Sequence, residues 1–245
     1  MHDHAVGTMT SADDGGESGC TVAHRRSQVQ FIESGRAVRI REISFASSYV
    51  YSPSDFSVAS RLLRVCVKSG RVKALVAQAI RGDGQAPRSP SLVRFFPADA
   101  TLVPVPGSRP SLRVRETAAE RLAVTLLKQG LGRRIWFGLR RVRAVPKSAT
   151  AAPGARTSVQ THYDSMAVDE ADSPAASHIV LIDDVVTKGR TLLAAAIRLQ
   201  EADPRVDLRA FALLRTVGYA GDICQFLAPC EGKIEWIGDD ARRSP

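Results

Sequence analysis

HIVLIDDVVTKGRT, residues 178–191, indicates the fold class of the chain, because an apolar run ends there in two adjacent aspartates and a turn follows at once. Four of the five residues in 178–182 are apolar, which is typical of a buried strand. The segment 190–203 has apolar residues at helical spacing on one side, and Asp203-Pro204 ends it. The order of strand, acidic end, turn and helix predicts one βα unit of a parallel sheet.

The two aspartates, Asp183 and Asp184, fall where ligands of open parallel sheets bind, beyond the carboxyl end of a strand. A carboxylate in that place can accept hydrogen bonds from the vicinal hydroxyls of a ribose. The turn after it offers backbone N–H groups at the positive end of a helix dipole, which suits a phosphate. Gly189 would let the backbone approach a ligand, and the hydroxyls of Thr187 and Thr191 add donors. A single ribose 5-phosphate group accounts for both halves.

Three other interpretations of this stretch were weighed. A Walker B strand also ends in acids, but it requires a GxxxxGK[ST] loop, which the chain lacks. A response-regulator receiver carries its acids after the first strand, with more α/β chain behind them than remains here. A turn in which Asp184 or Thr187 only caps the helix is the third. The complete D-D-V-x-T-x-G-x-T spacing argues against a cap alone.

Composition allows one medium domain with a real core, since the 245-residue chain is 44% hydrophobic. No window approaches the roughly 18 consecutive apolar residues of a membrane span, and the N-terminus lacks a secretory pattern. We therefore expect a cytoplasmic protein. The four cysteines form no CxxC pair, which argues against a zinc site.

The formal net charge of +9 fits either nucleic acid or small anionic substrates such as phosphates and pyrophosphates. Aromatic residues make up only 6% of the chain, so a stacking surface for single strands is poorly supplied. Charge alone does not choose between these partners.

Along the chain, residues 1–28 have the composition of a disordered leader, and 29–245 form the expected folded domain. Its core should cover about 100–240, after an N-terminal, largely helical part at about 29–99. The segment 143–177 has the length and composition of a functional loop or lid. The remaining segments are expected to alternate between strand and helix, which predicts an α/β fold with a mainly parallel sheet covered on both faces. The expected strands lie within 29–51, 101–110, 134–142, 178–183, 208–216 and 233–238; the expected helices lie within 54–82, with Ser54 as cap and Gly70 as break, 115–130 and 190–203.

VLIDDVVTKGRT resembles the phosphoribosyl pyrophosphate (PRPP) signature of the type I phosphoribosyltransferases, and within them the competence-protein F-like (ComF-like) branch. VKSGRVKALVAQ at 67–78 and LVPVP at 102–106 are similar to two further segments of that branch. The resemblance covers about residues 45–216. It implies a central, mainly parallel β-sheet flanked by helices, a small hood and a flexible loop. It also implies transfer of the phosphoribosyl group of PRPP, with Mg²⁺ carried on PRPP, to a nitrogen acceptor and release of pyrophosphate.

The resemblance also implies roles for particular residues. Asp183 and Asp184 would hold the ribose and act in catalysis, and Arg156 would be a catalytic residue of the 143–177 segment. Arg143, Lys147 and His162 are further candidates there, and His162 could act as a general acid or base, although a lone loop histidine is more often a surface residue. The segment expected to bind PRPP at its ribose and 5′-phosphate continues through Val185 and Val186, and the residues that would hold the 5′-phosphate itself are Thr187, Lys188, Gly189, Arg190 and Thr191. Those expected to face pyrophosphate are Ser108, Arg109, Arg113 and Arg115.

The chain departs from the branch at three places. Lys188 stands where the family often has Thr or Ser, and residues 115–118 replace its Arg-Gly-Phe-Asn motif. The cysteine-rich module common at the N-terminus of the branch is replaced by a polar leader. The acceptor is therefore not identified. Lys68 and Arg71 are expected to cap helix ends rather than face the pocket.

A second class of function stays open. The protein could sense PRPP or a nucleotide without turnover, or assist DNA uptake or processing as a competence F-type accessory protein. The basic charge supports this alternative, while the acids and the phosphate turn support ligand binding in both. Contact with nucleic acid and a homodimer are open, and neither a membrane partner nor a metal held by the protein alone is expected.

Overall fold

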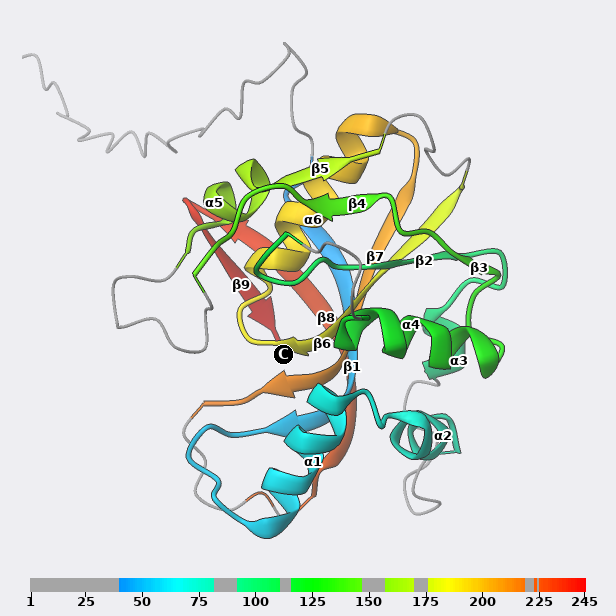
Figure 1. The fold of residues 1–245 in the computed structure, drawn as a ribbon, viewed down its shortest axis with the longest axis vertical. Coiled ribbons are helices and arrows are strands. Elements are labelled where there is room, and N and C mark those ends of the chain that lie inside the picture. The colour runs from blue at the N-terminus through cyan, green and yellow to red at the C-terminus, as the bar shows by residue number, and fades with distance from the viewer. Residues whose placement is uncertain are drawn as a thin grey trace, which may run out of the picture.

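The computed structural model describes residues 40–81, 92–110, 116–146, 157–169, 176–218, 223 and 225–245. It is an α/β fold built on a mixed, mostly parallel seven-stranded sheet with helices against it (Figure 1). Five neighbouring strands are parallel, β8 runs antiparallel to β1, and β9 runs antiparallel to β8. The strands are, in spatial order, β3 (Arg134–Ile135), β2 (Thr101–Pro104), β6 (His178–Val186), β7 (Asp207–Thr216), β1 (Glu42–Tyr51), β8 (Leu227–Ile237) and β9 (Asp240–Ser244).

Two groups of elements pack against the sheet. The first group contains only helices, and the second adds a two-stranded antiparallel sheet, β4–β5. The first group consists of α1 (Val58–Ser69), α2 (Lys73–Arg81), α3 (Leu92–Phe95) and α4 (Ala118–Lys128), and the second of α5 (Val159–Asp164), α6 (Arg190–Ala202), β4 (Leu139–Arg141) and β5 (Met166–Val168). Each group shares a separate apolar cluster with the sheet.

The strand β6 divides its apolar side chains between these two clusters. Val180 and Ile182 belong to the cluster of α1–α4, while Ile179 and Leu181 belong to the cluster of α5 and α6. This division follows from the period of two along a strand. It explains why the sequence shows an unbroken apolar run, since a strand covered on both faces has no polar side.

The topology places a crevice next to β6. From β2 the chain first continues to β3, on one side of β2, and then crosses to β6 and β7, on the other side. The strand order therefore changes direction between β2 and β6. Ligands of open α/β sheets bind at such a switch point, outside the carboxyl ends of the strands.

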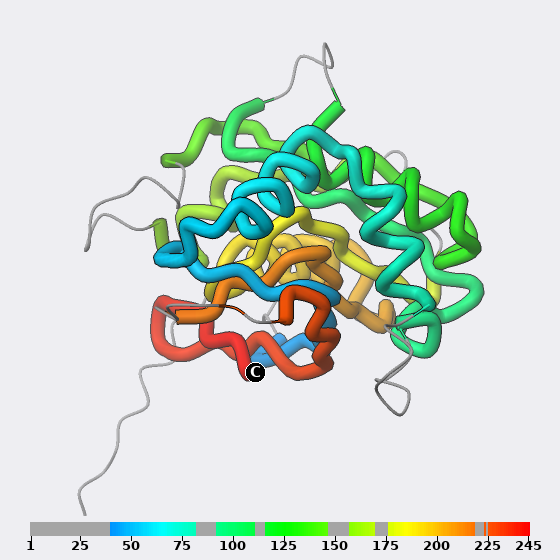
Figure 2. Tube along the Cα trace, turned by 90° about the horizontal axis from the view of Figure 1, so that it is seen from below, coloured from blue at the N-terminus to red at the C-terminus, as the bar shows by residue number. Residues whose placement is uncertain are grey.

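The strand β1 lies inside the sheet although it is the first of the described elements in the chain. It pairs in parallel with β7 and antiparallel with β8, and Figure 2 shows blue β1 beside the orange and red C-terminal strands. The division predicted near residue 100 therefore does not separate this strand from the central sheet. The predicted leader, 1–28, lies outside the described residues.

Several sequence predictions are confirmed. The strands near 101–104, 178–183, 208–216 and 233–238 are present, as is the helix that begins at Arg190. Gly70 ends α1 in the left-handed conformation, φ 72°, as expected of a helix break.

Four predictions need correction. Residues 134–142 form two short strands in different sheets, because β3 pairs with β2 whereas β4 pairs with β5. The segment 143–177 is not irregular throughout, since it contains α5 and β5. The cap of α1 is Ser57, whose side chain accepts from the backbone of Ser60, rather than Ser54. β6 continues through both aspartates to Val186, so the acids belong to the strand itself.

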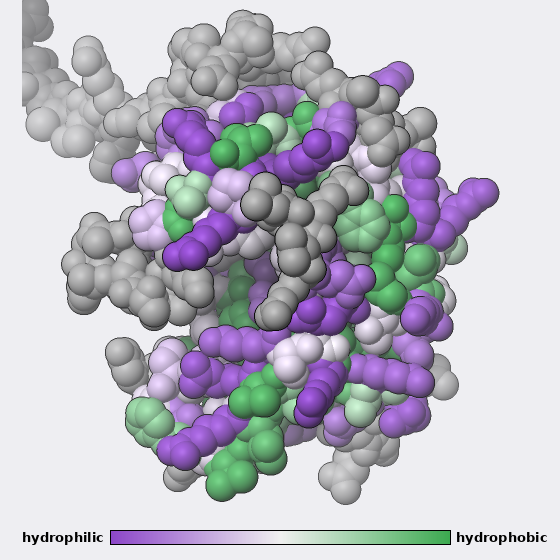
Figure 3. All heavy atoms as spheres, viewed as in Figure 1, coloured by the Kyte–Doolittle hydropathy of each residue, from purple (hydrophilic) through white to green (hydrophobic). Residues whose placement is uncertain are grey.

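The helix α1 has apolar residues on two sides. Leu63 and Val67 are buried, while Val58, Leu62 and the preceding Phe56 are exposed. Figure 3 shows apolar side chains at the end of the molecule where α1 lies. Among the described residues, no helix combines the length and the apolar character that crossing a membrane requires.

Phe211 of β7 is expected to be a main determinant of stability. Its ring is fully buried, with its centroid 5.3 Å from that of Phe96. Phe211→Ala should lower the free energy of unfolding by about 3–5 kcal/mol, because it removes buried area and leaves a cavity. Phe56→Ala, at a residue that is 73% exposed, should change it by less than about 0.5 kcal/mol. Urea denaturation followed by circular dichroism measures both, and equal effects would contradict this core assignment.

Candidate functional site

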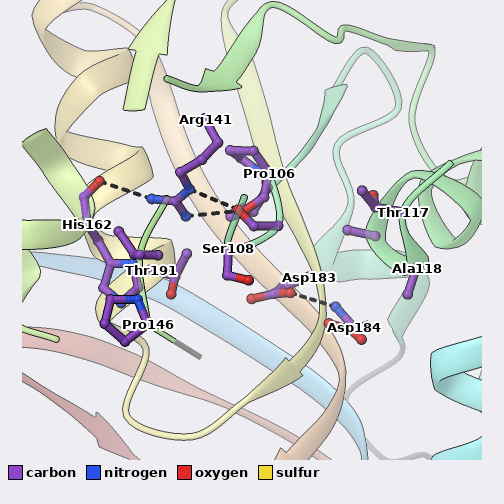
Figure 4. Close-up of a pocket in the computed structure, with 14 residues that line it drawn as sticks. Pro106, Ser108, Thr117, Ala118, Arg141, Pro146, His162, Asp183, Asp184 and Thr191 are labelled. Carbon is purple, nitrogen blue, oxygen red and sulfur yellow. Dashed lines mark hydrogen bonds between the residues drawn. The ribbon is translucent and has the colours of Figure 1, made fainter. Parts of the chain in front are cut away.

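A cavity of about 240 Å³ lies at the switch point, beyond the carboxyl ends of β2 and β6 (Figure 4). Parts of the chain that are far apart in sequence form its wall. The lining residues are Val105 to Ser108 after β2, Thr117 to Ala119 at the start of α4, Arg141 of β4, Val145 and Pro146, His162 of α5, Asp183 and Asp184 of β6, and Thr191 of α6.

The acidic pair lies in this cavity, as the sequence predicts. The backbone N–H of Asp184 donates to Oδ1 of Asp183 at 2.8 Å, which fixes one carboxylate relative to the next residue. Burial, and then the neighbouring Asp184 carboxylate, raise the pKa of Asp183 well above its ordinary value, and the Arg141 cation opposes this only in part. A site that keeps two acids together in this way stores electrostatic repulsion, which is typical of functional positions.

Only part of the predicted pyrophosphate group reaches the cavity. Ser108 lines it, and the Ser108 carbonyl accepts from the backbone N–H of Val145 at 2.8 Å, which ties the loop after β2 to the chain after β4. Arg109 is exposed and does not line the cavity. Arg113 and Arg115 lie outside the described residues.

The buried cation of the cavity is Arg141, which the sequence did not single out. Its Nε donates to the carbonyl of Gly107 at 2.8 Å, and its terminal nitrogens donate to the carbonyls of Pro106 and His162, each at 3.3 Å. The hydroxyl of Ser165 accepts a further bond. Burial lowers the pKa of Arg141 to about 10 and the Asp183 carboxylate opposes this, so the guanidinium remains charged at neutral pH.

Of residues 185–191, which the sequence predicts to bind PRPP, Thr191 lines the cavity and the others do not. Lys188 Nζ lies 2.7 Å from a carboxylate oxygen of Asp240, which also binds the Arg190 guanidinium. Hydrogen bonds from the Arg190 guanidinium, and to a smaller extent from Lys188, hold the pKa of Asp240 well below its ordinary value. Gly189 caps α6 without any side-chain hydrogen bond to the helix end, which leaves the terminal N–H groups uncapped by a side chain.

Gly189 is required for a reason other than the predicted approach of a ligand. Its φ is 88°, and a Cβ there would lie 2.7 Å from the Ile234 side chain. The left-handed turn and its packing on β8 therefore require glycine. Thr187 is exposed and does not line the cavity, and its carbonyl accepts from Arg243 at 3.0 Å. Of the two threonines predicted to bind phosphate, Thr191 is the one that lines the cavity.

His162 is buried in the cavity wall, so the expectation of a surface position is wrong. It lies on α5, and neither ring nitrogen has a hydrogen-bond partner among the described residues. Burial, followed by the cations of Arg141 and Arg190, lowers the pKa of His162 to about 4. The sequence interpretation failed because α5 has only six residues and its buried face is too short to show a period.

The other candidates of this region do not line the cavity. Arg143 is exposed and donates to the carbonyl of Asp164. Lys68 and Arg71 lie at the end of α1 and beyond it. The carbonyls of the last turn accept from the backbone N–H groups of Gly70 and Arg71 and, at the Lys68 carbonyl, from the Arg121 guanidinium at 3.4 Å. Lys147 and the predicted catalytic Arg156 lie outside the described residues.

Metal binding by the protein alone finds no support among the residues that the structure describes, which contain no group of three or more His, Cys, Asp or Glu able to hold an ion. Asp183 and Asp184 are the two carboxylates of the cavity. Two acids without a third ligand fit a magnesium ion that arrives with a phosphorylated substrate, because Mg²⁺ is commonly bound by one or two carboxylates together with phosphate oxygens.

No model of a known protein family matches the chain, and no curated protein matches it either. The functional assignment therefore depends on the geometry of the cavity and on the resemblance of the 178–191 segment.

Replacing Asp183 should stabilise the protein in a pH-dependent way. Because folding raises the pKa of Asp183, the folded protein binds the proton of this carboxyl more tightly than the unfolded chain does. That contribution is complete below about pH 4, the pKa of an unfolded aspartate, and is lost as the pH rises through the folded-state value. Asp183→Asn should therefore raise the free energy of unfolding at pH 8 by about 1–3 kcal/mol, with no difference near pH 4.

Urea denaturation at the two pH values measures this difference. Glu231→Gln, a loss of one carboxylate at an exposed position of β8, is the matched control and should follow the wild-type profile at both values. An Asp183→Asn protein that is less stable than wild type at pH 8 would contradict the repulsion described for the acidic pair.

Proposed function

We propose that the protein is a type I phosphoribosyltransferase-like enzyme of the ComF-like kind, which binds PRPP with Mg²⁺ and transfers the phosphoribosyl group to a nitrogen acceptor with release of pyrophosphate. One observation carries the proposal: a single cavity at the switch point of the sheet is lined both by the paired acids of β6 and by Thr191 in the first turn of α6. The resemblance of VLIDDVVTKGRT to the PRPP signature supports it.

The cavity offers a separate partner to each part of PRPP. Asp183 and Asp184 suit the ribose diol, because ionised carboxylates are acceptors for hydroxyl donors. The uncapped amino end of α6 and the Thr191 hydroxyl suit the 5′-phosphate. The loop after β2, at Gly107 and Ser108, lies beside Arg141 and suits the pyrophosphate.

In the proposed reaction, the bond from the ribose C1 to the pyrophosphate oxygen breaks with its electron pair, and a nitrogen lone pair forms the new bond. Positive charge develops on the sugar ring, and the Asp183 and Asp184 carboxylates stabilise it electrostatically. The Arg141 cation offsets the charge of the leaving pyrophosphate. The amino end of α6 holds the 5′-phosphate still, so that C1 stays aligned for attack. The acceptor nitrogen gives up its proton to solvent or to the released pyrophosphate after bond formation.

Magnesium fits this arrangement as part of the substrate. Asp183 and Asp184 are the residues of the cavity that would contact it, and the ion would add charge neutralisation at the pyrophosphate.

A second candidate function uses the same cavity without turnover, as a PRPP or nucleotide sensor or an accessory protein that handles DNA. One observation favours contact with an anionic polymer: residues 56–81, which include α1 and α2, contain six Lys and Arg and no Asp or Glu. DNA binding through these cations would weaken steeply as salt rises, because counterions compete.

The decisive experiment measures PRPP binding with Mg²⁺ by calorimetry and pyrophosphate release with a panel of nucleobases and amines. The Asp183→Asn/Asp184→Asn protein should lose at least about 100-fold in PRPP affinity, because two hydrogen bonds to charged acceptors are weakened. Asp207→Asn is the control and should bind as wild type. Asp207 lies at the amino end of β7, whereas the cavity lies at the carboxyl ends of the strands.

Each outcome is informative. Binding with pyrophosphate release supports the enzyme, and binding without release from any acceptor supports the sensor. A double variant that binds PRPP as tightly as wild type would refute the ribose assignment. Circular dichroism of both variants separates a lost site from a lost fold.

Arg141→Lys tests the partner of the pyrophosphate. Lysine keeps the charge but cannot bind the carbonyls of Pro106 and Gly107 as a fork, so the loop after β2 loses its support. We expect pyrophosphate affinity to fall about 10-fold and ribose 5-phosphate affinity to change less than about threefold. Arg140→Lys, at the exposed neighbour that binds Asp169, is the matched control in the same titrations. Equal losses for both ligands would remove the assignment of Arg141 to the pyrophosphate.

A further inference from the structure

His162 is the buried polar group of the cavity whose bonding is incomplete. Its side chain is 3% exposed, and both ring nitrogens lack a hydrogen-bond partner among the described residues. An unsatisfied buried donor or acceptor costs about 1–3 kcal/mol. Figure 4 shows the residue in the cavity wall close to Thr191 and Pro146. A ring kept in this state inside a cavity is suited to a ligand that supplies the missing partner.

The surroundings of the ring are dominated by cations. Arg141 of β4 and Arg190 at the start of α6 act on it from two sides, while Asp183 and Asp184 of β6 line the same cavity. Burial and the two guanidinium groups lower the pKa of His162 to about 4, so the ring is neutral at physiological pH while the cavity holds no anion.

The charged groups on the remaining sides of α5 are engaged elsewhere. Asp240 of β9 binds Arg190 and Lys188. On the side toward α6, the Tyr163 hydroxyl donates to Glu201 at 2.7 Å, and Arg198 lies 3.6 Å from the centre of the Tyr163 ring. Arg143, after β4, donates to the carbonyl of Asp164.

Two independent features therefore meet at one end of the cavity. The first is the amino end of α6, a 13-residue helix without a side-chain cap, with Thr191 in its first turn. The second is the unpartnered and buried imidazole of His162. A helix terminus attracts anions through its N–H groups and its dipole. The neutral imidazole has one N–H donor, and protonation makes both nitrogens donors and adds a positive charge.

We propose that His162 is a proton-linked ligand of a phosphoryl group bound at the amino end of α6: the neutral ring takes up one proton from solvent when the dianion binds, and donates a charge-assisted hydrogen bond to it. The dianion reverses the local field, because its negative charge outweighs the effect of the two cations at the ring and pairs with the imidazolium. No bond breaks in this step except that of the transferred proton. The inference rests on the proposed function only for the sugar phosphate as the natural source of the group.

A pH dependence follows from this coupling. The complex holds one proton more than the free protein, so affinity falls as the pH rises above about 4, the pKa of His162 in the free protein, until the ring is neutral in the complex as well.

Sulfate is the direct probe, because it is a dianion that carries no proton of its own near neutral pH and makes no use of the ribose acids. Imidazole signals of the full chain are followed by NMR at pH 6 during titration with sodium sulfate. The His162 signals should move to the protonated position, with the same midpoint as the Thr191 amide shift. The signals of His178, an exposed histidine bonded to Asp99, should not follow this curve. A His162 ring that stays neutral while the Thr191 amide shifts overturns the proposal, as does the lack of any sulfate response.

Calorimetry with two ligands then identifies the source of the phosphoryl group. His162→Gln should weaken ribose 5-phosphate binding about 10-fold at pH 6, the value of one charge-assisted hydrogen bond, with a smaller difference at pH 9. Pyrophosphate affinity should stay within about twofold, and His178→Gln should behave as wild type with both ligands. A loss confined to pyrophosphate would put the imidazole at the other end of PRPP and overturn the placement at α6. The NMR titration uses the unaltered protein, so it stands even if His162→Gln folds poorly.

The two proposals fail separately. Sulfate-linked protonation of His162 in a protein that does not bind PRPP would keep this anion site and remove the phosphoribosyltransferase function. PRPP binding and pyrophosphate release that are unchanged at pH 6 in His162→Gln would keep the function and remove the role of His162.

Discussion

The buried guanidinium of Arg141 is the interaction on which the candidate site depends, because it joins separate parts of the chain. Its nitrogens donate to the loop after β2, at Pro106 and Gly107, and to α5 at the His162 carbonyl and the Ser165 hydroxyl. Neither the loop nor the short helix belongs to the central sheet. A planar cation with five donors can fix both at once, which a lysine cannot do. The wall opposite the acids therefore has a defined position before any ligand binds.

The positive and negative charges of the cavity offset one another only in part. The Arg141 cation offsets the two carboxylates of β6 only in part, so Asp183 keeps a raised pKa. Asp240 neutralises two cations of the turn, the exposed Lys188 and the partly buried Arg190, and neither of them lines the cavity. A ligand that carries hydroxyl donors and phosphoryl anions completes both halves, whereas a neutral apolar ligand completes neither.

The sequence predicts the parts of the fold that depend on local pattern. The apolar run before Asp183 and the helix after Gly189 are visible because each pattern is long and covered by the core. Arg141 and His162 could not be predicted, because their roles come from contacts made far along the chain. Arg140 and Arg141 are adjacent and chemically identical, and only the pairing of β4 with β5 decides which of them is buried. The same holds for Asp240, whose partners lie about 50 residues earlier.

The position of β1 affects how the protein folds during translation. This strand leaves the ribosome first among the described elements, yet its hydrogen-bonding partners on both sides, β7 and β8, are among the last to be made. Eight of its ten residues are buried in the finished sheet, seven of them in one unbroken run. During translation the segment must stay unpaired, with its backbone groups open to a wrong strand or to a chaperone. Sequence-distant pairing of this kind slows folding, so nascent chains should depend on protection until the last hairpin emerges.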